Sequence, residues 1–275
     1  MCIRDRIYSA EEFTVNAESE NLCPYELNKL LLKKAQIVIV PYVYFFEDFI
    51  RKYLLGWMDT TIDKIITIVD EAHNLPDWSR EAASESLSVD SLHRASQESD
   101  KFGLLLGDGS PPTLFLDLVE SALKSLGEYH IPEGDDEGLL PSHIVSLDSE
   151  VPTFETEMMS LGKMTLYRLK QQSSDLSKMG QLIRQTLLEK GKRPRSYLGS
   201  VGDFLCRWLD SIESHTIRLV GNKPLRLEKV CLDPRVMTSF LDETAGVVMM
   251  SGTLSPLGTV SYTHLRAHET VLDIV

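Results

Sequence analysis

Hydrophobic and polar positions in the first part of the chain follow two periods, and together they predict a strand, a helix and a second strand. The run 35–40 is apolar, rich in β-branched residues and stopped by Pro41, which is typical of a short strand. Residues 44–57 repeat apolar side chains at helical spacing. Residues 64–69 are nearly all apolar, as expected for a parallel strand covered on both faces. This order predicts a βαβ unit.

The pattern changes to long helical repeats from about residue 81 to 219, which predicts a large, mostly helical insert. The expected helices span 90–106, 113–129, 153–173 and 176–190. Beyond the insert, 246–250 is again a fully apolar strand, so we expect the sheet to resume within 220–259. The predicted fold class is therefore α/β, a parallel-sheet domain interrupted by a mostly α-helical insert.

The bulk properties predict a globular protein from a reducing environment. The 275 residues are 43% hydrophobic, which is enough for buried cores. No run approaches the roughly 20 apolar residues that a membrane helix needs. The four cysteines, Cys2, Cys23, Cys206 and Cys231, lie far apart and predict neither a disulfide framework nor a self-contained zinc site. We expect a cytoplasmic protein with no membrane segment.

The formal net charge of −13 disfavours nucleic acid as a partner, but the charge is unevenly distributed. Between residues 163 and 195, nine basic side chains face only Asp175 and Glu189. Such a stretch is either a solvated helix face with a basic loop or a surface that binds phosphates. The second interpretation makes candidates of Lys163, Arg168, Lys170, Arg184, Lys192, Arg193 and Arg195.

Both ends of the chain look foreign to the rest, and they are excluded from the fold prediction. Residues 1–6 and 260–275 resemble translated sequencing-adaptor sequence. His264, His268 and Glu269 would otherwise suggest a zinc site on a helix face, an interpretation that is set aside with the segment.

Two acidic residues follow the apolar strand at 64–69. Asp70 and Glu71 would lie at the carboxyl edge of a parallel sheet, where open α/β sheets bind their ligands. In phosphoryl-transfer ATPases the first such carboxylate binds the Mg²⁺ of ATP, and the second can polarise the attacking water. His73 follows, where an imidazole can link a nucleotide site to moving elements. A surface histidine in a turn is the simpler alternative for that residue.

A second polar turn follows the strand at 246–250. Ser251, Gly252 and Thr253 supply two hydroxyl groups and a flexible glycine at the same predicted edge. Alone, this turn would be unremarkable. Its combination with Asp70 and Glu71 predicts a catalytic edge for ATP and Mg²⁺.

Four motifs resemble those of superfamily 2 helicases of the XPD and DinG type, which are iron–sulfur enzymes acting on DNA. The motifs are CPYE at 23–26, VDEAHNL at 69–75, CLDP at 231–234 and SGTLSP at 251–256. About 180 residues separate the second motif from the last. Ordinary DEAD or DEAH helicases join these strands by a short connection, so the long insert favours the XPD-like type. The two cysteine motifs favour an archaeal XPD.

The resemblance implies a domain organisation and a set of cofactors. Residues 7–34 would end an iron–sulfur region, with Cys23 as one thiolate ligand of a [4Fe–4S] cluster. Residues 35–80 and 220–259 would form part of a RecA-like motor domain. Residues 81–219 would form an arch domain that helps to enclose single-stranded DNA. The resemblance also implies 5′ to 3′ unwinding in DNA repair, with partners among repair-complex proteins.

The sequence also departs from this family. It contains no Gly-x-x-x-x-Gly-Lys-Ser/Thr phosphate loop, and no second motor domain follows residue 255. We therefore expect the 275-residue polypeptide by itself neither to hydrolyse ATP nor to unwind DNA. The main alternative is a noncatalytic nucleic-acid-binding or repair-complex scaffold. An RNA-directed DEAH helicase is disfavoured by the long insert and by the CPYE motif.

Overall fold

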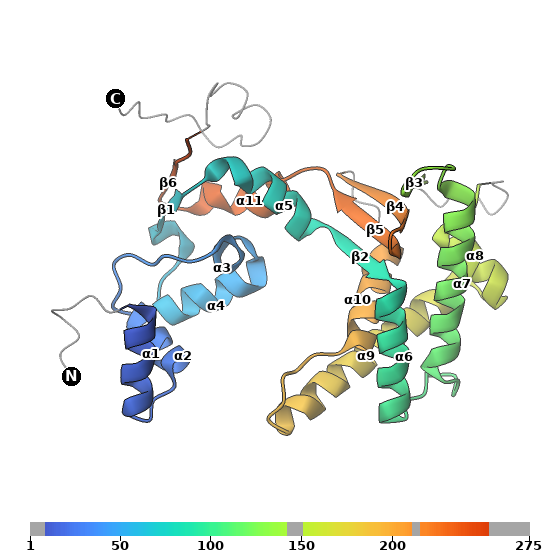
Figure 1. Ribbon diagram of the computed structural model, residues 1–275, viewed down its shortest axis with the longest axis horizontal. Coiled ribbons are helices and arrows are strands. Elements are labelled where there is room, and N and C mark those ends of the chain that lie inside the picture. Colours follow the sequence, from blue (N-terminus) through green and yellow to red (C-terminus); the bar gives the residue numbers. More distant parts are fainter. Residues whose placement is uncertain (1–8, 142–150, 211–214, 253–275) are drawn as a thin grey trace. The chain divides into compact units, whose positions relative to one another are not determined.

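The chain folds into two compact units, each of which has its own core (Figure 1). The computed structural model describes residues 9–141, 151–210 and 215–252. Unit 1 comprises residues 1–79 and 234–275, and unit 2 comprises residues 80–233.

Unit 1 combines short helices with a two-stranded sheet. Its first helix begins with a capping box, in which Ser9 and Glu12 satisfy each other's backbone N–H groups. Its elements are α1 (Ala10–Ser19), α2 (Pro24–Leu32), α3 (Tyr42–Phe46), α4 (Asp48–Met58), η2 (Ile62–Lys64), β1 (Ile66–Val69), η3 (Ala72–Asn74), α11 (Arg235–Thr238), η4 (Ser239–Glu243) and β6 (Gly246–Met249). Helix α5 (Leu75–Ala83) runs from unit 1 into unit 2.

The two strands of unit 1 pair in parallel although they lie far apart in sequence. Ile66 is opposite Gly246 and Val69 is opposite Met249, which confirms the predicted parallel sheet. The sheet is covered on one face, where Thr67 and Val69 are buried. The other face is open, since Ile66 and Ile68 remain 67% and 63% exposed. The expectation that this strand is covered on both faces is therefore wrong for the described part of the chain.

The prediction of a strand at 35–40 is also wrong. This run is neither helix nor strand, it pairs with no strand among the described residues, and Ile37 and Ile39 are strongly exposed. A β-branched composition favours extended backbone, but a strand also needs a partner for its N–H and C=O groups.

The helix predicted at 44–57 is broken at Glu47, which has extended backbone angles. The break leaves carbonyl groups at the end of α3 without helical partners. The buried Arg51 supplies them, because its Nη1 donates to the carbonyl oxygens of Phe45 (3.1 Å) and Phe46 (3.3 Å). Both rings pack against Phe240, with centroids 5.4 and 5.5 Å away, so α3 and α4 are fixed to the core of unit 1.

Unit 2 is mostly helical, as predicted, but it contains a four-stranded antiparallel sheet that the sequence pattern did not predict. The strand order is β2-β5-β4-β3. The elements are β2 (Glu85–Ser88), α6 (Val89–Phe102), α7 (Pro112–His130), β3 (Glu137–Leu140), α8 (Phe154–Gly162), α9 (Leu166–Glu189), α10 (Tyr197–Leu209), β4 (Thr216–Asn222) and β5 (Leu225–Cys231).

This sheet moves the boundary of the insert. We expected the parallel-sheet domain to resume at about residue 220, but β4 and β5 pair with each other and with β2 and β3. The compact unit therefore continues to Asp233 instead of ending at 219. The sequence of 225–232 does alternate, yet alternation alone does not identify the partner strand.

Two helix boundaries in unit 2 differ from the prediction. The predicted break between 173 and 176 is wrong, because α9 is continuous and the break lies at Lys163, which adopts a left-handed conformation. Helix α10 is not among the four expected helices, which end at residue 190, and its glycines lower helix propensity. The glycines have a packing role, since a Cβ at Gly180 of α9 would lie 2.0 Å from the Cα of Gly199. Small residues here let the two helices approach.

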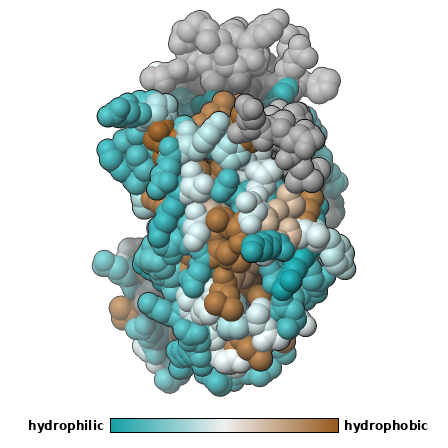
Figure 2. Space-filling model, turned by 90° about the vertical axis from the view of Figure 1, so that its right-hand side faces the viewer, coloured by the Kyte–Doolittle hydropathy of each residue, from teal (hydrophilic) through white to brown (hydrophobic). Residues whose placement is uncertain are grey.

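Figure 2 shows apolar side chains gathered among hydrophilic ones on the face that it draws. Exposed apolar residues of unit 2 include Leu114, Leu139 and Leu161. None of the helices in the described ranges has both the length and the apolar character that a membrane crossing would need.

Candidate active site

The carboxyl ends of β1 and β6 meet, and they bring the two predicted polar turns together. Met250 donates its N–H to the carbonyl of Val69 (2.8 Å), and Ala72 donates to the carbonyl of Met250 (3.0 Å). These two bonds extend the strand pairing by one step on each side. As a result, the segments that carry Asp70 and Ser251 leave the sheet side by side.

His73 joins the two turns. Its Nδ1 lies 2.6 Å from the hydroxyl of Ser251 and 3.3 Å from Oε2 of Glu71. With Nδ1 protonated, the ring donates to the Glu71 carboxylate or to the serine oxygen; in the other tautomer, the serine hydroxyl donates to the ring. One imidazole nitrogen thus contacts both a carboxylate on one turn and a hydroxyl on the other.

Glu71 adopts a left-handed backbone conformation, with φ of 48°, which is uncommon for a residue with a side chain. Such conformations cost free energy and persist where the surrounding structure enforces them. Here the N–H of Glu71 binds Oδ1 of Asp70 (2.9 Å). The unusual conformation turns the chain sharply after β1 and presents both carboxylates to solvent.

Tyr42 holds this turn, and no motif in the sequence identifies it. Its hydroxyl donates to the carbonyl oxygens of Asp70 (2.5 Å) and Glu71 (3.1 Å). Its ring packs edge-on against Phe46 and Trp78. Burial, followed by the charges of Asp70 and Glu71, raises the pKa of Tyr42, so the hydroxyl remains a donor at neutral pH. The neighbouring Pro41 predicts only that a helix starts here, and it does not indicate the contact of Tyr42 with the Asp70–Glu71 turn.

The oxygens at this edge suit a hard cation in part. Asp70 is exposed at the end of a parallel strand, and one of its oxygens already binds a backbone N–H. A carboxylate in this position could bind Mg²⁺, which prefers oxygen ligands and keeps several waters. Within the described ranges, no three His, Cys, Asp or Glu residues gather closely enough to hold a metal ion by themselves. Any such ion would therefore need further ligands, such as phosphate oxygens.

The remaining predicted residues of the edge are less informative. Gly252 is exposed and has open space around it. Thr253 lies outside the described residues. Cys23 is an exposed free thiol at the start of α2, in unit 1, whereas Cys206 and Cys231 belong to unit 2. The described residues therefore place no second thiolate in the same unit as Cys23, and the four thiolates of a [4Fe–4S] cluster are not assembled from them.

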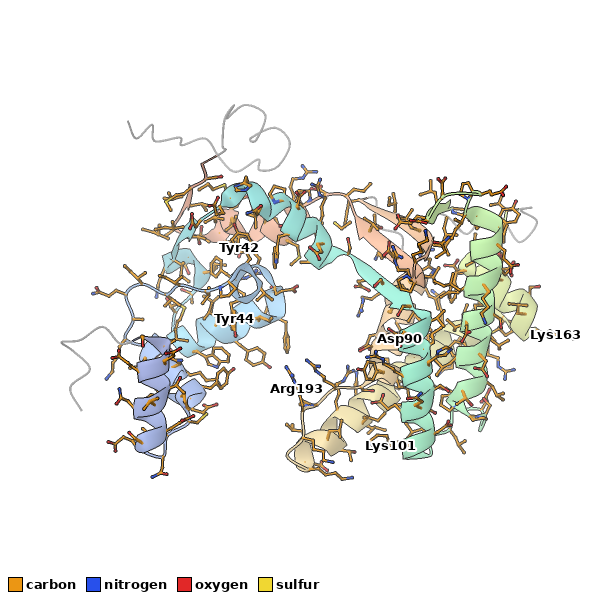
Figure 3. The ribbon with its side chains drawn as sticks, viewed as in Figure 1. Tyr42, Tyr44, Asp90, Lys101, Lys163 and Arg193 are labelled. Atoms are coloured by element: carbon orange, nitrogen blue, oxygen red, sulfur yellow. The ribbon has the colours of Figure 1, made fainter. Side chains whose placement is uncertain are left out.

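The basic stretch of unit 2 extends along the whole length of helix α9. Helix α9 has 24 residues and is therefore about 36 Å long. Lys163 precedes this helix and Arg193 follows it, so the two lie at opposite ends, as their labels in Figure 3 show. Two further members are held by acids within the unit: Arg168 pairs with Asp108 (2.7 Å), and Arg184 pairs with Asp203 (3.2 Å).

A compact basic group remains at the carboxyl end of α9. Lys192, Arg193 and Arg195 are exposed in the loop that leads to α10, and we call this segment the basic loop. Arg94 of α6 lies beside it, because its guanidinium donates to the hydroxyl of Tyr197 (3.1 Å), the first residue of α10. Lys163 and Lys170 are also exposed, but they lie toward the opposite end of α9.

Two family models match separate ranges of the chain. A model described as DEAD_2 matches residues 1–92, and one described as helical and beta-bridge domain matches residues 149–271. The Fanconi anemia group J protein homolog of Gallus gallus is 37% identical over 78 residues, which cover 28% of this chain and 6% of that protein. ATP-dependent DNA helicase CHL1 of Saccharomyces cerevisiae (strain YJM789) is 29% identical over 96 residues, or 34% of this chain and 11% of that protein. The matches thus span about a tenth or less of the length of these relatives.

Solved structures resemble the chain over most of its length. The one named XPD_Helicase has a TM-score of 0.55 and 21% identity, covering 92% of this chain and 38% of that structure. The one named Truncated XPD has a TM-score of 0.57 and 20% identity, covering 96% of this chain and 65% of that structure. At these identities the likeness shows the fold, and it agrees with the predicted α/β domain that carries a helical insert.

Proposed function

Because the chain belongs to the XPD/DinG type of superfamily 2 helicases, we propose that it provides the metal-binding edge of an ATP site and a DNA-contacting insert. The activity of the helicase that contains this chain would be ATP-dependent unwinding of DNA. The 275 residues hold no Gly-x-x-x-x-Gly-Lys-Ser/Thr loop, so other parts of a helicase would supply the contacts to the β- and γ-phosphates.

One observation carries this proposal: the parallel pairing of β1 and β6 brings the Asp70–Glu71 turn and Ser251 to one edge, joined through His73. In this arrangement Asp70 would bind Mg²⁺, which neutralises charge on the phosphates when bound. Glu71 would orient and polarise the attacking water. His73 would couple the Glu71 carboxylate to the turn after β6, because its Nδ1 contacts both Glu71 and Ser251.

The test uses a helicase that contains this chain. Asp70→Asn is expected to lower kcat for ATP hydrolysis by at least about 100-fold, because an amide holds a cation poorly. Asp242→Asn is the matched control, since Asp242 is also an exposed aspartate of unit 1 but lies in η4, which precedes β6, whereas the edge follows it. The isolated 275-residue chain is expected to show no ATPase activity. Hydrolysis by that isolated chain, abolished by Asp70→Asn, would contradict the second expectation.

The basic loop is the proposed contact for single-stranded DNA in unit 2. Its three cations are exposed and lie together, and a flexible polyanion is bound by such clusters through release of counterions. Reversing Arg193 and Arg195 to Glu is expected to weaken binding and to reduce the salt slope by about 0.7 for each phosphate that is no longer neutralised. Lys163→Glu with Lys170→Glu makes the same charge change at the other end of α9. Equal effects of the two pairs, or no effect of either, would rule out the loop as the contact.

Three finer properties rest on the family alone. We propose a [4Fe–4S] cluster with Cys23 as one of four ligands, 5′ to 3′ polarity and a role in DNA repair with protein partners. Cys23→Ser in the helicase should remove the iron-dependent visible absorbance if the thiolate is a ligand. An unchanged spectrum would leave Cys23 as an ordinary surface thiol.

A further inference from the structure

Helix α4 carries three aromatic residues in a line, and a fourth from α2 continues it. Phe49, Tyr53 and Trp57 are spaced four residues apart, so they lie on one face of the helix with a rise of about 6 Å between them. The ring centroids of Phe49 and Tyr53 are 4.9 Å apart, and those of Tyr53 and Trp57 are 6.2 Å apart. Tyr25 follows at 6.2 Å from Trp57. We call these four residues the aromatic row.

The row is not needed to fill the core of unit 1. Phe49 and Tyr53 are 69% and 51% exposed, and Tyr25 is also exposed. The buried side chains of α4 are instead Leu54 and Arg51, and of the three row residues on α4 only the partly buried Trp57 packs against the core. Keeping large apolar rings in water forgoes the free energy that their burial would bring, so an exposed line of them indicates a binding surface.

Two lysines lie beside the rings of the row. The Nζ of Lys29 lies 4.2 Å from the ring centroid of Tyr25 and 4.9 Å from that of Trp57. Lys52 lies next to Tyr53 in the chain and is exposed. Each lysine is already paired with an acid of its own helix, so the surface carries cations but little excess charge. Stacking of flat, partly polar groups is the chemistry that these side chains offer, with phosphate contacts in second place.

We propose that the aromatic row of α4 is a stacking platform for the unpaired bases of single-stranded DNA. The inference rests on the proposed function, because it takes DNA as the partner, but it uses a different unit and a different chemistry from the basic loop. Bases stack on aromatic side chains without regard to sequence, and rows of such rings with neighbouring cations are typical of surfaces that track a single strand. Phe49 and Tyr53 make the platform, and Trp57 anchors it to the core.

The experiment measures binding of a fluorescently labelled oligo-dT to the 275-residue chain by anisotropy. Phe49→Leu with Tyr53→Leu removes both exposed rings and keeps apolar side chains, and it is expected to weaken binding at least about tenfold. The salt slope should stay unchanged, because no cation is removed. Tyr129→Leu, at an exposed tyrosine of α7, is the matched control and should bind like the wild type. Tyr53→Phe keeps the ring and should also bind normally.

An abasic oligonucleotide, which has the same phosphates but no bases, separates stacking from charge. The wild type should prefer oligo-dT over the abasic strand, and the Phe49→Leu/Tyr53→Leu variant should lose that preference. If the variant keeps the preference, the platform is refuted while DNA binding itself stands. If the wild type binds neither strand, the proposed DNA contact of the chain fails as well. The Phe49→Leu/Tyr53→Leu variant could instead have a lower melting temperature or a changed oligomeric state while its DNA preference is unchanged. That result would mean that the row packs against protein, and it would also overturn the proposal.

Discussion

Replacing Tyr42 with Phe removes one oxygen atom and tests how the turn that carries Asp70 and Glu71 is held. The hydroxyl donates to two carbonyl oxygens but has a single proton, so about one hydrogen bond is removed. A neutral hydrogen bond contributes about 0.5–1.5 kcal/mol, and the two backbone oxygens are left without this partner. We expect unit 1 to lose about that much stability, since the ring contacts with Phe46 and Trp78 remain.

Tyr42→Phe should lower the rate of ATP hydrolysis by more than its loss of folding stability alone would cause. The same bond fixes the turn that carries Asp70 and Glu71, so in a helicase containing this chain kcat for ATP hydrolysis should fall about tenfold with little change in KM. The matched control is Tyr44→Phe, two residues along α3, at the exposed tyrosine that Figure 3 labels beside Tyr42. This substitution should leave both quantities unchanged.

The pH dependence gives an independent readout. Burial and the neighbouring carboxylates raise the pKa of Tyr42 above its ordinary value near 10. The contribution of the protonated hydroxyl is therefore fully present below about pH 10, and it is lost only as the pH rises through the raised value. The ratio of wild-type to Tyr42→Phe activity should stay constant from about pH 6 to 9. A ratio near one, or one that varies across this range, would refute the role assigned to the hydroxyl.

Three predictions concern unit 2. Arg218→Met should destabilise it by about 3–5 kcal/mol in chemical denaturation, because it strands the buried Glu155, and adding Glu155→Met should restore most of the loss. Gly180→Ala should destabilise it by about 1–3 kcal/mol, because the added Cβ meets the backbone of Gly199. Hydrogen bonds from Ser110 and then Arg168 lower the pKa of Asp108, so its stabilisation should fade below about pH 4, and Asp108→Asn should remove that part of the acid sensitivity in thermal melts.

Periodicity and motif chemistry predicted the parts of the fold that depend on local sequence. The strand before Asp70 is nearly all apolar and is followed by two acids, a pattern that indicates a sheet edge without any knowledge of the neighbouring strand. The pairing of that strand with 246–249 could be expected because both are apolar and both lead into polar turns. The contact between His73 and Ser251 follows from this pairing, whereas the roles of the two side chains remain predictions.

Properties that depend on distant partners could not be predicted in the same way. The composition of 35–40 favours extended backbone, but no local signal tells whether a neighbouring strand is present. The basic stretch is continuous along the chain, yet a 24-residue helix separates its ends and two of its arginines bind acids from other segments. Tyr42 escapes prediction for the same reason, because its partners are carbonyl oxygens 28 and 29 residues away.

The antiparallel sheet of unit 2 explains how so large an insert can separate β1 from β6 without disturbing their pairing. The insert enters through β2 and leaves through β5, and these two strands are direct neighbours, with Glu85 opposite Lys229. Ser84 closes the junction, because its hydroxyl accepts the N–H of Cys231 (2.9 Å). The two ends of unit 2 therefore emerge together from a paired, folded base. The folding of unit 2 brings residues 80 and 233 together and so meets the entropic cost of closing this long loop. For the pairing of β1 with β6, residues 80–233 therefore act as a short connection.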